Sequence, residues 1–209
     1  MRVLNGVWVR VFRVDVVGRL GASHVMGEAV RRWSAPLPSS VVCDNKAVAL
    51  TQTCLCLLTR VVGDGEREVL LGHKKTGLGT GKIVALGGHV EERETAAEAA
   101  AREVTEESGI RVAADSLREA AHITFLFPTC PAWDMTVEVF TSGTWRGEAG
   151  ETEEIRPEWF PVADLPLDRM WDDGKHWVPR VLAGERLRAT FSYASDCATV
   201  ADAAIDPLP

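Results

Sequence analysis

The stretch that decides how this chain folds runs from Gly88 to Ile110 and reads GHVEERETAAEAAAREVTEESGI. Thr95 stands three residues before Glu98, which is the spacing of a capping box, where each side chain bonds the backbone N–H of the other residue. An alanine-rich run follows, and Gly109 occupies the position at which helices commonly end. The sequence therefore predicts a helix that begins after Thr95 and ends at Ser108.

Three glutamates, Glu103, Glu106 and Glu107, lie near the end of this predicted helix. Residues three and four positions apart share one face of a helix, so the three carboxylates come close together. Like charges at such distances repel unless a cation lies between them, and Mg²⁺ prefers carboxylate oxygens together with substrate phosphates. The spacing indicates a site for Mg²⁺ and a phosphorylated substrate. Glu106 taken alone favours a plainer interpretation, a solvated helix face.

The whole segment resembles the signature of the Nudix hydrolase family. The matching residues are Gly88, Glu94, Arg102, Glu103, Val104, Glu106, Glu107, Gly109 and Ile110. Seven fixed identities and two aliphatic positions would match by chance on the order of once in ten million such chains. The combined pattern therefore outweighs the solvated-face interpretation.

This resemblance implies an α/β fold, the Nudix α/β/α sandwich around a mixed β-sheet. It also implies hydrolysis of nucleoside diphosphates linked to another moiety, by attack of water on phosphorus with a divalent metal. The residues implied to act in catalysis are Glu94, Arg102, Glu103, Glu106 and Glu107, and those implied to bind Mg²⁺ or Mn²⁺ are Gly88, through its carbonyl, Glu103, Glu106 and Glu107. Such a metal polarises phosphoryl oxygens and lowers the pKa of a bound water. Either a glutamate or a metal-bound hydroxide can then serve as the general base.

The flanking sequence resembles the MutT-like, mammalian 8-oxo-dGTP diphosphatase branch of the family, over about residues 47–205. This likeness implies that Trp171 stacks on a purine and that Asp173 hydrogen-bonds the edge of the base. The residues implied to bind substrate are Thr53, Lys74, Leu78, Phe125, Phe127, Met135, Trp171, Asp173 and Trp177. On pattern alone, most of the apolar members of this group would be assigned to the core.

Two departures from that branch leave the preferred base open. Val84 stands where the branch has an asparagine, and its side chain can neither donate nor accept a hydrogen bond. An ungapped comparison places Asp173 and Gly174 where the branch has two consecutive aspartates. A shift by one residue would restore the pair as Asp172 and Asp173.

Composition and cysteine usage exclude several classes of protein. The 209 residues are 46% hydrophobic and 25% charged, which is ordinary for a globular protein. The longest apolar stretches are strand-sized, well short of the roughly 20 residues that span a bilayer, so we expect no membrane span. Five cysteines without a CxxC pair argue against a secreted disulfide scaffold and favour a reducing interior. We therefore expect a cytoplasmic location.

The charge is distributed unevenly along the chain. Residues 1–46 hold seven Lys and Arg against three Asp and Glu, a balance of +4, so the total of −7 leaves −11 for residues 47–209. Such an acidic body is a poor ligand for duplex nucleic acid, and an anionic substrate would need metal ions to bind it. We expect residues 1–46 to be an extension outside the core. A transit peptide, or a start codon placed upstream of Met26, are alternatives.

Residues 47–209 are predicted to form one Nudix hydrolase domain. The expected strands cover residues 47–58, 68–71, 82–86, 120–127 and 135–140, a region around Trp159 and Phe160, and 189–193 as the final strand, with a second helix at 176–183. These strands and helices, mixed in this order, suggest a sandwich around a mixed sheet.

The predicted activity is hydrolysis of a nucleoside triphosphate to the monophosphate and pyrophosphate by a monomer. Oxidised purine nucleotides such as 8-oxo-dGTP are the leading substrate class. A noncatalytic nucleotide-sensing module is an alternative, although such a module would be expected to lose the metal-ligand carboxylates, which are all present. A pyrophosphatase for ADP-ribose or dinucleotides is a further alternative that no residue positively selects.

The domain boundary yields a first testable prediction. A protein truncated to begin at Asn45 should fold and should retain the kcat/KM of the full chain, because residues 1–46 differ in composition and charge from the rest. Circular dichroism and steady-state kinetics on both proteins measure this. If the truncated protein is insoluble or inactive while the full chain works, the segment belongs to the domain.

Overall fold

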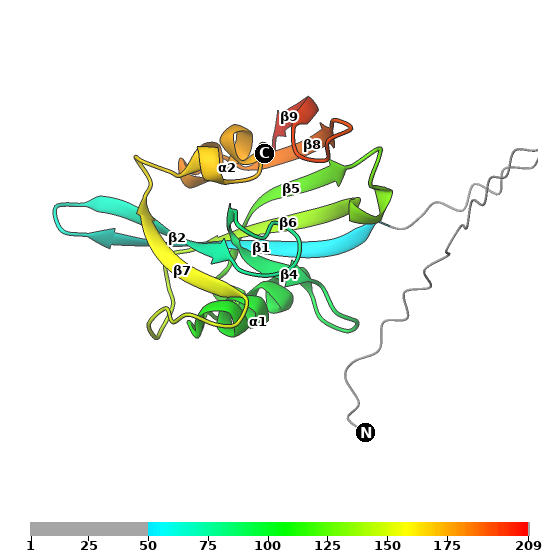
Figure 1. The fold of residues 1–209 in the computed structure, drawn as a ribbon. Helices are drawn as coiled ribbons and strands as arrows, with labels where there is room; N and C mark the ends of the chain where they lie inside the picture. The colour runs from blue at the N-terminus through cyan, green and yellow to red at the C-terminus, as the bar shows by residue number, and fades with distance from the viewer. Residues whose placement is uncertain (1–49, 209) are drawn as a thin grey trace, which may run out of the picture. The chain divides into compact units, whose positions relative to one another are not determined.

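The computed structural model describes residues 50–208, which form a mixed nine-stranded sheet with two α-helices (Figure 1). The predicted extension, residues 1–46, and residues 47–49 of the predicted first strand lie outside the described residues. The strands are β1 (Thr51–Val62), β2 (Glu66–Lys74), β3 (Ile83–Val84), β4 (Leu86–His89), β5 (Arg118–Leu126), β6 (Met135–Ser142), β7 (Ile155–Pro161), β8 (Leu187–Tyr193) and β9 (Val200–Pro207). The helices are α1 (Ala96–Ser108) and α2 (Gly174–Leu182), and short 3₁₀ turns lie at Ala114–Ser116, Pro131–Trp133 and Leu167–Arg169.

The sheet has the order β3-β2-β1-β6-β5-β8-β9, with β4 paired to β1 and β7 paired to β2. Two strand pairs, β1 with β6 and β5 with β8, are parallel, and the others are antiparallel. Figure 1 shows α1 below the sheet and α2 above it. The predicted sandwich around a mixed sheet is confirmed.

Side chains that alternate along β1 serve the two faces of the sheet. Cys54, Cys56 and Leu58 belong to the buried cluster that contains Val104 of α1, whereas Leu57 belongs to the cluster that contains Trp177 of α2. Successive residues of a strand point to opposite faces, so one strand can supply two cores. β1 therefore contributes side chains to both buried clusters, one on each face of the sheet.

Helix α1 has the limits that the sequence predicts. The Thr95 side chain accepts a hydrogen bond from the Glu98 N–H at 3.2 Å, and the Glu98 carboxylate accepts one from the Thr95 N–H at 2.8 Å. Gly109 has the left-handed conformation, with φ of 76°, and its N–H bonds the Thr105 carbonyl. Both ends of the helix are thus fixed by local contacts.

The strand predictions need two corrections. Residues 189–193 are not the final strand, because β9 follows and pairs antiparallel with β8. The predicted strand 82–86 is divided, since β3 pairs with β2 and β4 pairs with β1. The stretch that forms β9 carries aspartates and alanines, which have low strand propensity, so its pairing with β8 decides its conformation.

Within residues 50–208, no helix has the length and apolar character needed to cross a bilayer.

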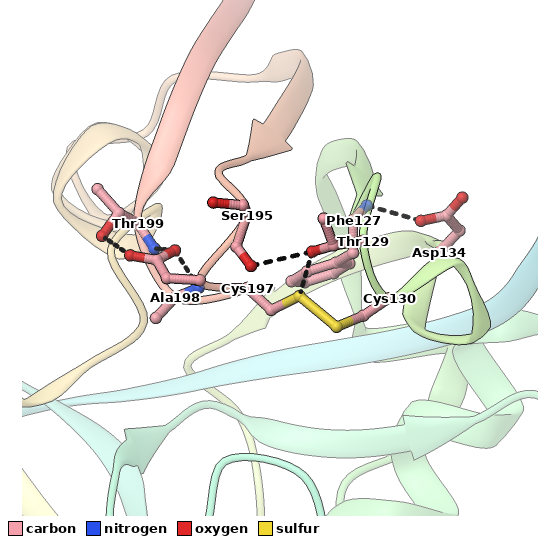
Figure 2. The surroundings of a disulfide bond; sticks show 9 residues. Phe127, Thr129, Cys130, Asp134, Ser195, Cys197, Ala198 and Thr199 are labelled. Carbon is pink, nitrogen blue, oxygen red and sulfur yellow. Dashed lines mark hydrogen bonds between the residues drawn. A yellow bond between two sulfur atoms is a disulfide. The ribbon is translucent and has the colours of Figure 1, made fainter. Parts of the chain in front are cut away.

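A disulfide joins Cys130 to Cys197 across two loops that are far apart in the sequence (Figure 2). Strands β5 and β8 are parallel neighbours, with Leu126 opposite Ser192. The two strands therefore end at the same edge of the sheet, and each cysteine follows shortly after its strand. This bond runs against the reducing interior that the number and spacing of the cysteines favoured. It was missed because it depends on the pairing of the strands.

Gly87 makes an approach that only glycine permits, which gives a prediction for stability. Its φ is 153°, and a Cβ atom at this position would lie 2.1 Å from the Cys54 carbonyl oxygen of β1. We expect Gly87→Ala to lower the free energy of unfolding by about 1–3 kcal/mol or more, because backbone must move.

The matched control for that change is Gly143→Ala. There the nearest atoms to a new Cβ belong to Thr59 at 3.7 Å, an ordinary contact, so the effect should stay within about 0.5 kcal/mol. Urea denaturation of both variants and the unchanged chain measures the difference. Equal stability of the two variants would contradict the close approach.

Candidate active site

A cavity of about 810 Å³ brings together carboxylates from α1, backbone from β4 and a group of aromatic side chains. Every residue that the sequence predicts for the site lines this cavity except Glu94, which lies next to Arg102. The predicted residues on the cavity wall are Thr53, Lys74, Leu78, Gly88, Arg102, Glu103, Glu106, Glu107, Phe125, Phe127, Met135, Trp171, Asp173 and Trp177. Segments far apart in the sequence thus meet at one site.

Arg102 holds the acidic residues of this region together. One guanidinium nitrogen, Nη2, donates to the Glu94 carboxylate at 2.8 Å and to the His89 carbonyl at 3.0 Å. The other, Nη1, donates to Glu103 at 2.9 Å and to Glu106 at 3.2 Å. The hydrogen bond from Arg102 is the main cause that lowers the pKa of Glu94. The salt bridge that the resemblance implies between Arg102 and Glu94 is present.

Glu107 is the buried carboxylate of the group and links three elements. It accepts a hydrogen bond from the Gly87 N–H of β4 at 2.9 Å and another from the Lys74 ammonium of β2 at 3.1 Å. Burial raises the pKa of Glu107, and these two donors oppose that rise. Lys74 also donates to Glu154 at 3.3 Å. The end of α1 is therefore held to the sheet by charged contacts.

Gly88 lets the Glu103 carboxylate rest directly on the backbone of β4. A Cβ atom at Gly88 would lie between 2.4 and 2.8 Å from the atoms of that carboxylate. The Cys54 thiol is 3.6 Å from the Gly88 carbonyl oxygen, and burial raises the pKa of this thiol to about 11. The protonated Cys54 thiol donates a hydrogen bond to this carbonyl oxygen.

These oxygen donors suit a hard divalent cation. Within residues 50–208, no three His, Cys, Asp or Glu side chains already converge as a metal centre. Instead, Arg102 and Lys74 balance the charge of the glutamates. The Glu103 carboxylate beside Gly88 and its neighbours on α1 fit the metal that the sequence resemblance implies, and Glu103, Glu106, Glu107 and the Gly88 carbonyl would hold it. Such a metal supplies Lewis-acid catalysis and an activated water.

A connected set of aromatic rings forms another part of the cavity wall. Phe127 stacks on Tyr193 with ring centroids 4.4 Å apart, and Trp171 meets Tyr193 edge to face at 6.1 Å. Trp133 meets Phe127 edge to face at 5.6 Å. The Lys82 ammonium lies 4.9 Å from the centre of the Trp171 ring. Sequence reasoning missed Tyr193 and Trp133, because neither belongs to a motif.

Asp173 lies in the cavity wall and is only 5% exposed. Its carboxylate accepts hydrogen bonds from Trp177 Nε1, at 2.7 Å, and from the Tyr193 hydroxyl. Burial raises the pKa of Asp173, and these donors oppose that rise. A carboxylate has about four acceptor positions, so it can still accept a bond from a ligand.

Asp172 lies outside the lining of this cavity and has other partners. Its carboxylate accepts hydrogen bonds from the Lys175 ammonium and from the Val200 N–H of β9. Of the two aspartates, Asp173 lines this cavity and Asp172 does not, and Gly174 lines it as well. Val84 lines the same cavity and adds an apolar surface to it.

The NUDIX domain family model matches residues 57–181, more than half of the chain. Two relatives are both called oxidized purine nucleoside triphosphate hydrolase. The one from Mus musculus is 37% identical over 137 residues and the one from Danio rerio is 39% identical over the same length, and each match covers 66% of this chain and 86% of the relative.

A solved structure, the mutator MutT protein from Bacillus halodurans, has the same fold, with a TM-score of 0.62 and 24% identity. That match covers 77% of this chain and all of the MutT chain. The family match and the two relatives show that the chain belongs to the Nudix hydrolase family, whose members act on nucleotides and generally use divalent metal ions.

The buried pair of Tyr193 and Asp173 gives a prediction with a pH dependence. Tyr193→Phe removes one donor to the carboxylate and should lower the free energy of unfolding by about 1–3 kcal/mol at pH 7. Losing this donor raises the pKa of Asp173 in the folded state further above the unfolded value of 3.8. The penalty acts on the charged form, so it should be largest above the folded pKa and should shrink as the pH falls toward 4.

Urea denaturation between pH 4 and pH 8 measures this difference. In a protein that already carries Asp173→Asn, the same Tyr193→Phe change should have an effect that no longer varies with pH. A loss of stability that stays constant with pH in the presence of Asp173 would contradict the proposed coupling.

Proposed function

We propose that this Nudix hydrolase cleaves purine nucleoside triphosphates to the monophosphate and pyrophosphate with Mg²⁺, and that oxidised purines such as 8-oxo-dGTP are the preferred substrates. One observation carries the proposal. The same cavity is lined by the α1 carboxylates and by an aromatic group with a buried acceptor, Asp173. A nucleoside triphosphate carries both kinds of matching group, phosphates for a metal site and a base for an aromatic wall.

The residues around α1 divide the phosphate chemistry among them. Glu103, Glu106 and Glu107 would hold the metal, and Arg102 keeps two of these carboxylates in place through direct hydrogen bonds. Lys74 brings a positive charge to the cavity wall beside Glu107. Fixed positive groups stabilise charge on phosphoryl oxygens because they need no reorganisation during the reaction.

The aromatic group would bind the base. Trp171 is half-buried on the cavity wall, and its indole offers a large stacking surface. Asp173 would accept hydrogen bonds from donor groups on the base edge, whereas Val84 offers no polar contact. A polar group discriminates strongly, because a wrong base leaves it unpaired, and an apolar wall discriminates weakly. Base preference should therefore depend mainly on Asp173.

The names of the two curated relatives support an oxidised purine substrate, since those proteins share 37% and 39% identity with this chain. The acidic charge of residues 47–209 favours a small nucleotide over duplex nucleic acid as the ligand. The cytoplasmic location and the monomeric state stay predictions.

Glu107→Gln tests the chemistry. The change keeps the shape of the side chain and removes its charge, so turnover should fall by about 100-fold or more with the fold retained. The substrates to assay with Mg²⁺ are 8-oxo-dGTP, 2-hydroxy-dATP, dGTP and ADP-ribose, with analysis of the products. Excess chelator should abolish turnover of each substrate used.

The matched control is Glu92→Gln, which changes an exposed glutamate outside the cavity lining and should leave turnover unchanged. Near-normal activity of a folded Glu107→Gln protein would overturn the metal mechanism. Preferential hydrolysis of ADP-ribose would replace the proposed substrate, and binding without hydrolysis of any nucleotide would favour a sensing module.

A further inference from the structure

Trp133 is a large apolar side chain that stays exposed although it lies on the cavity wall. Among residues 50–208, the exposed large hydrophobic side chains are Val61, Leu78 and Trp133, with 69%, 43% and 37% of their surface accessible. Leu78 and Trp133 line the cavity, and Val61 does not. Exposed apolar surface inside a concave site is typical of a ligand contact.

The Trp133 ring extends the aromatic wall described above. It stands nearly perpendicular to Phe127, with an angle of 80° between the two planes, and Phe127 is itself stacked on Tyr193. Within the described part of the chain, no other ring stacks face to face on this indole. The indole therefore has surface to offer to a flat ligand beside residues already assigned to the base.

The segment that carries Trp133 is held on both sides. The backbone N–H of Trp133 donates to the Cys130 carbonyl at 2.8 Å, and the Asp134 carboxylate accepts a hydrogen bond from the backbone N–H of Phe127 at 2.7 Å. The disulfide then fixes Cys130 to Cys197, in the turn between β8 and β9 (Figure 2). A side chain held in place before the ligand arrives loses less freedom on binding.

We propose that Trp133 is a further substrate-contacting residue that packs against the base of the nucleotide, and that the Cys130–Cys197 disulfide positions it. The inference rests on the proposed function. The base is the part in question because Trp133 contacts Phe127 of the aromatic wall, whereas the carboxylates belong to α1. An aromatic side chain can stack on any base, and the contact contributes mainly to the affinity for the nucleotide.

Trp133→Ala tests the contact. KM for a purine nucleoside triphosphate should rise on the order of tenfold, with kcat within about twofold of the unchanged enzyme. KM for 2-deoxyribose 5-triphosphate, which carries the phosphates and sugar but no base, should not change. The matched control is Val61→Ala, which removes exposed apolar surface outside the cavity and should leave both KM values unchanged.

Two results would overturn the contact. One is an unchanged KM for the purine substrate, and the other is an equal rise for the substrate without a base. If the unchanged protein hydrolyses no nucleotide, the proposed function fails while Trp133 can still be tested. Calorimetric titration with 8-oxo-dGMP then decides, because Trp133→Ala should weaken binding of this nucleotide about tenfold and unchanged binding would refute the contact.

Cys197→Ser tests the positioning role of the disulfide. It should raise KM for the purine substrate in the same direction as Trp133→Ala, with kcat nearly unchanged. The two changes combined should raise KM no more than Trp133→Ala alone, because the disulfide acts through Trp133. Dithiothreitol should reproduce the effect in the unchanged protein and have no effect on Cys197→Ser. Additive effects, or an unchanged KM in Cys197→Ser, would overturn this positioning role.

Discussion

The site depends on two positively charged side chains, Arg102 and Lys74, which balance the negative charge of the glutamates at the end of α1. Arg102 bonds two glutamates of its own helix and also Glu94 and the His89 carbonyl, so it ties the segment that follows β4 to the helix. Lys74 of β2 bonds Glu107 from the other side. Carboxylates crowded on one helix face would otherwise repel, and their mutual position would not be defined. The same contacts that hold α1 against the sheet therefore fix the positions of the glutamate oxygen atoms.

Two adjacent glycines allow this arrangement. Gly87 comes so close to the Cys54 carbonyl that no side chain fits, and at Gly88 a Cβ atom would lie 2.4 Å from the Glu103 carboxylate. β4 is thus packed by its backbone against β1 on one side and against a charged side chain of α1 on the other. The close approach gives Glu107 a backbone donor, the Gly87 N–H, and leaves the Gly88 carbonyl beside the carboxylates. The arrangement of the site therefore requires glycine at both positions, Gly87 and Gly88.

The sequence predicted the parts of the fold that local contacts determine. Helix α1 was predicted to its limits, because Thr95, Glu98 and Gly109 fix its ends within the segment itself. Strand β9 and the Cys130–Cys197 disulfide were not predicted, because both depend on where β8 lies. The glutamates of the site could be grouped from the sequence for the same reason, because all three lie on α1. Trp133 and Tyr193 were missed, since they reach the cavity only through the order of the strands.

The carboxylates are placed by contacts local in the sequence and the aromatic rings by the order of the strands, so the groups proposed for chemistry and for selectivity come from different parts of the chain. The carboxylate group comes from α1, and β4, the strand that precedes it in the sequence, supplies backbone groups beside it. The aromatic group joins β5, β8 and the start of α2. Tyr193 connects the aromatic group, because it stacks on Phe127, meets Trp171 and donates to the Asp173 carboxylate. The acceptor proposed to read the base is therefore held by a contact between β8 and the start of α2. Substitutions in these later elements can change the preferred base while Arg102 and the glutamates keep their contacts, so selectivity can vary with the hydrolytic chemistry held constant.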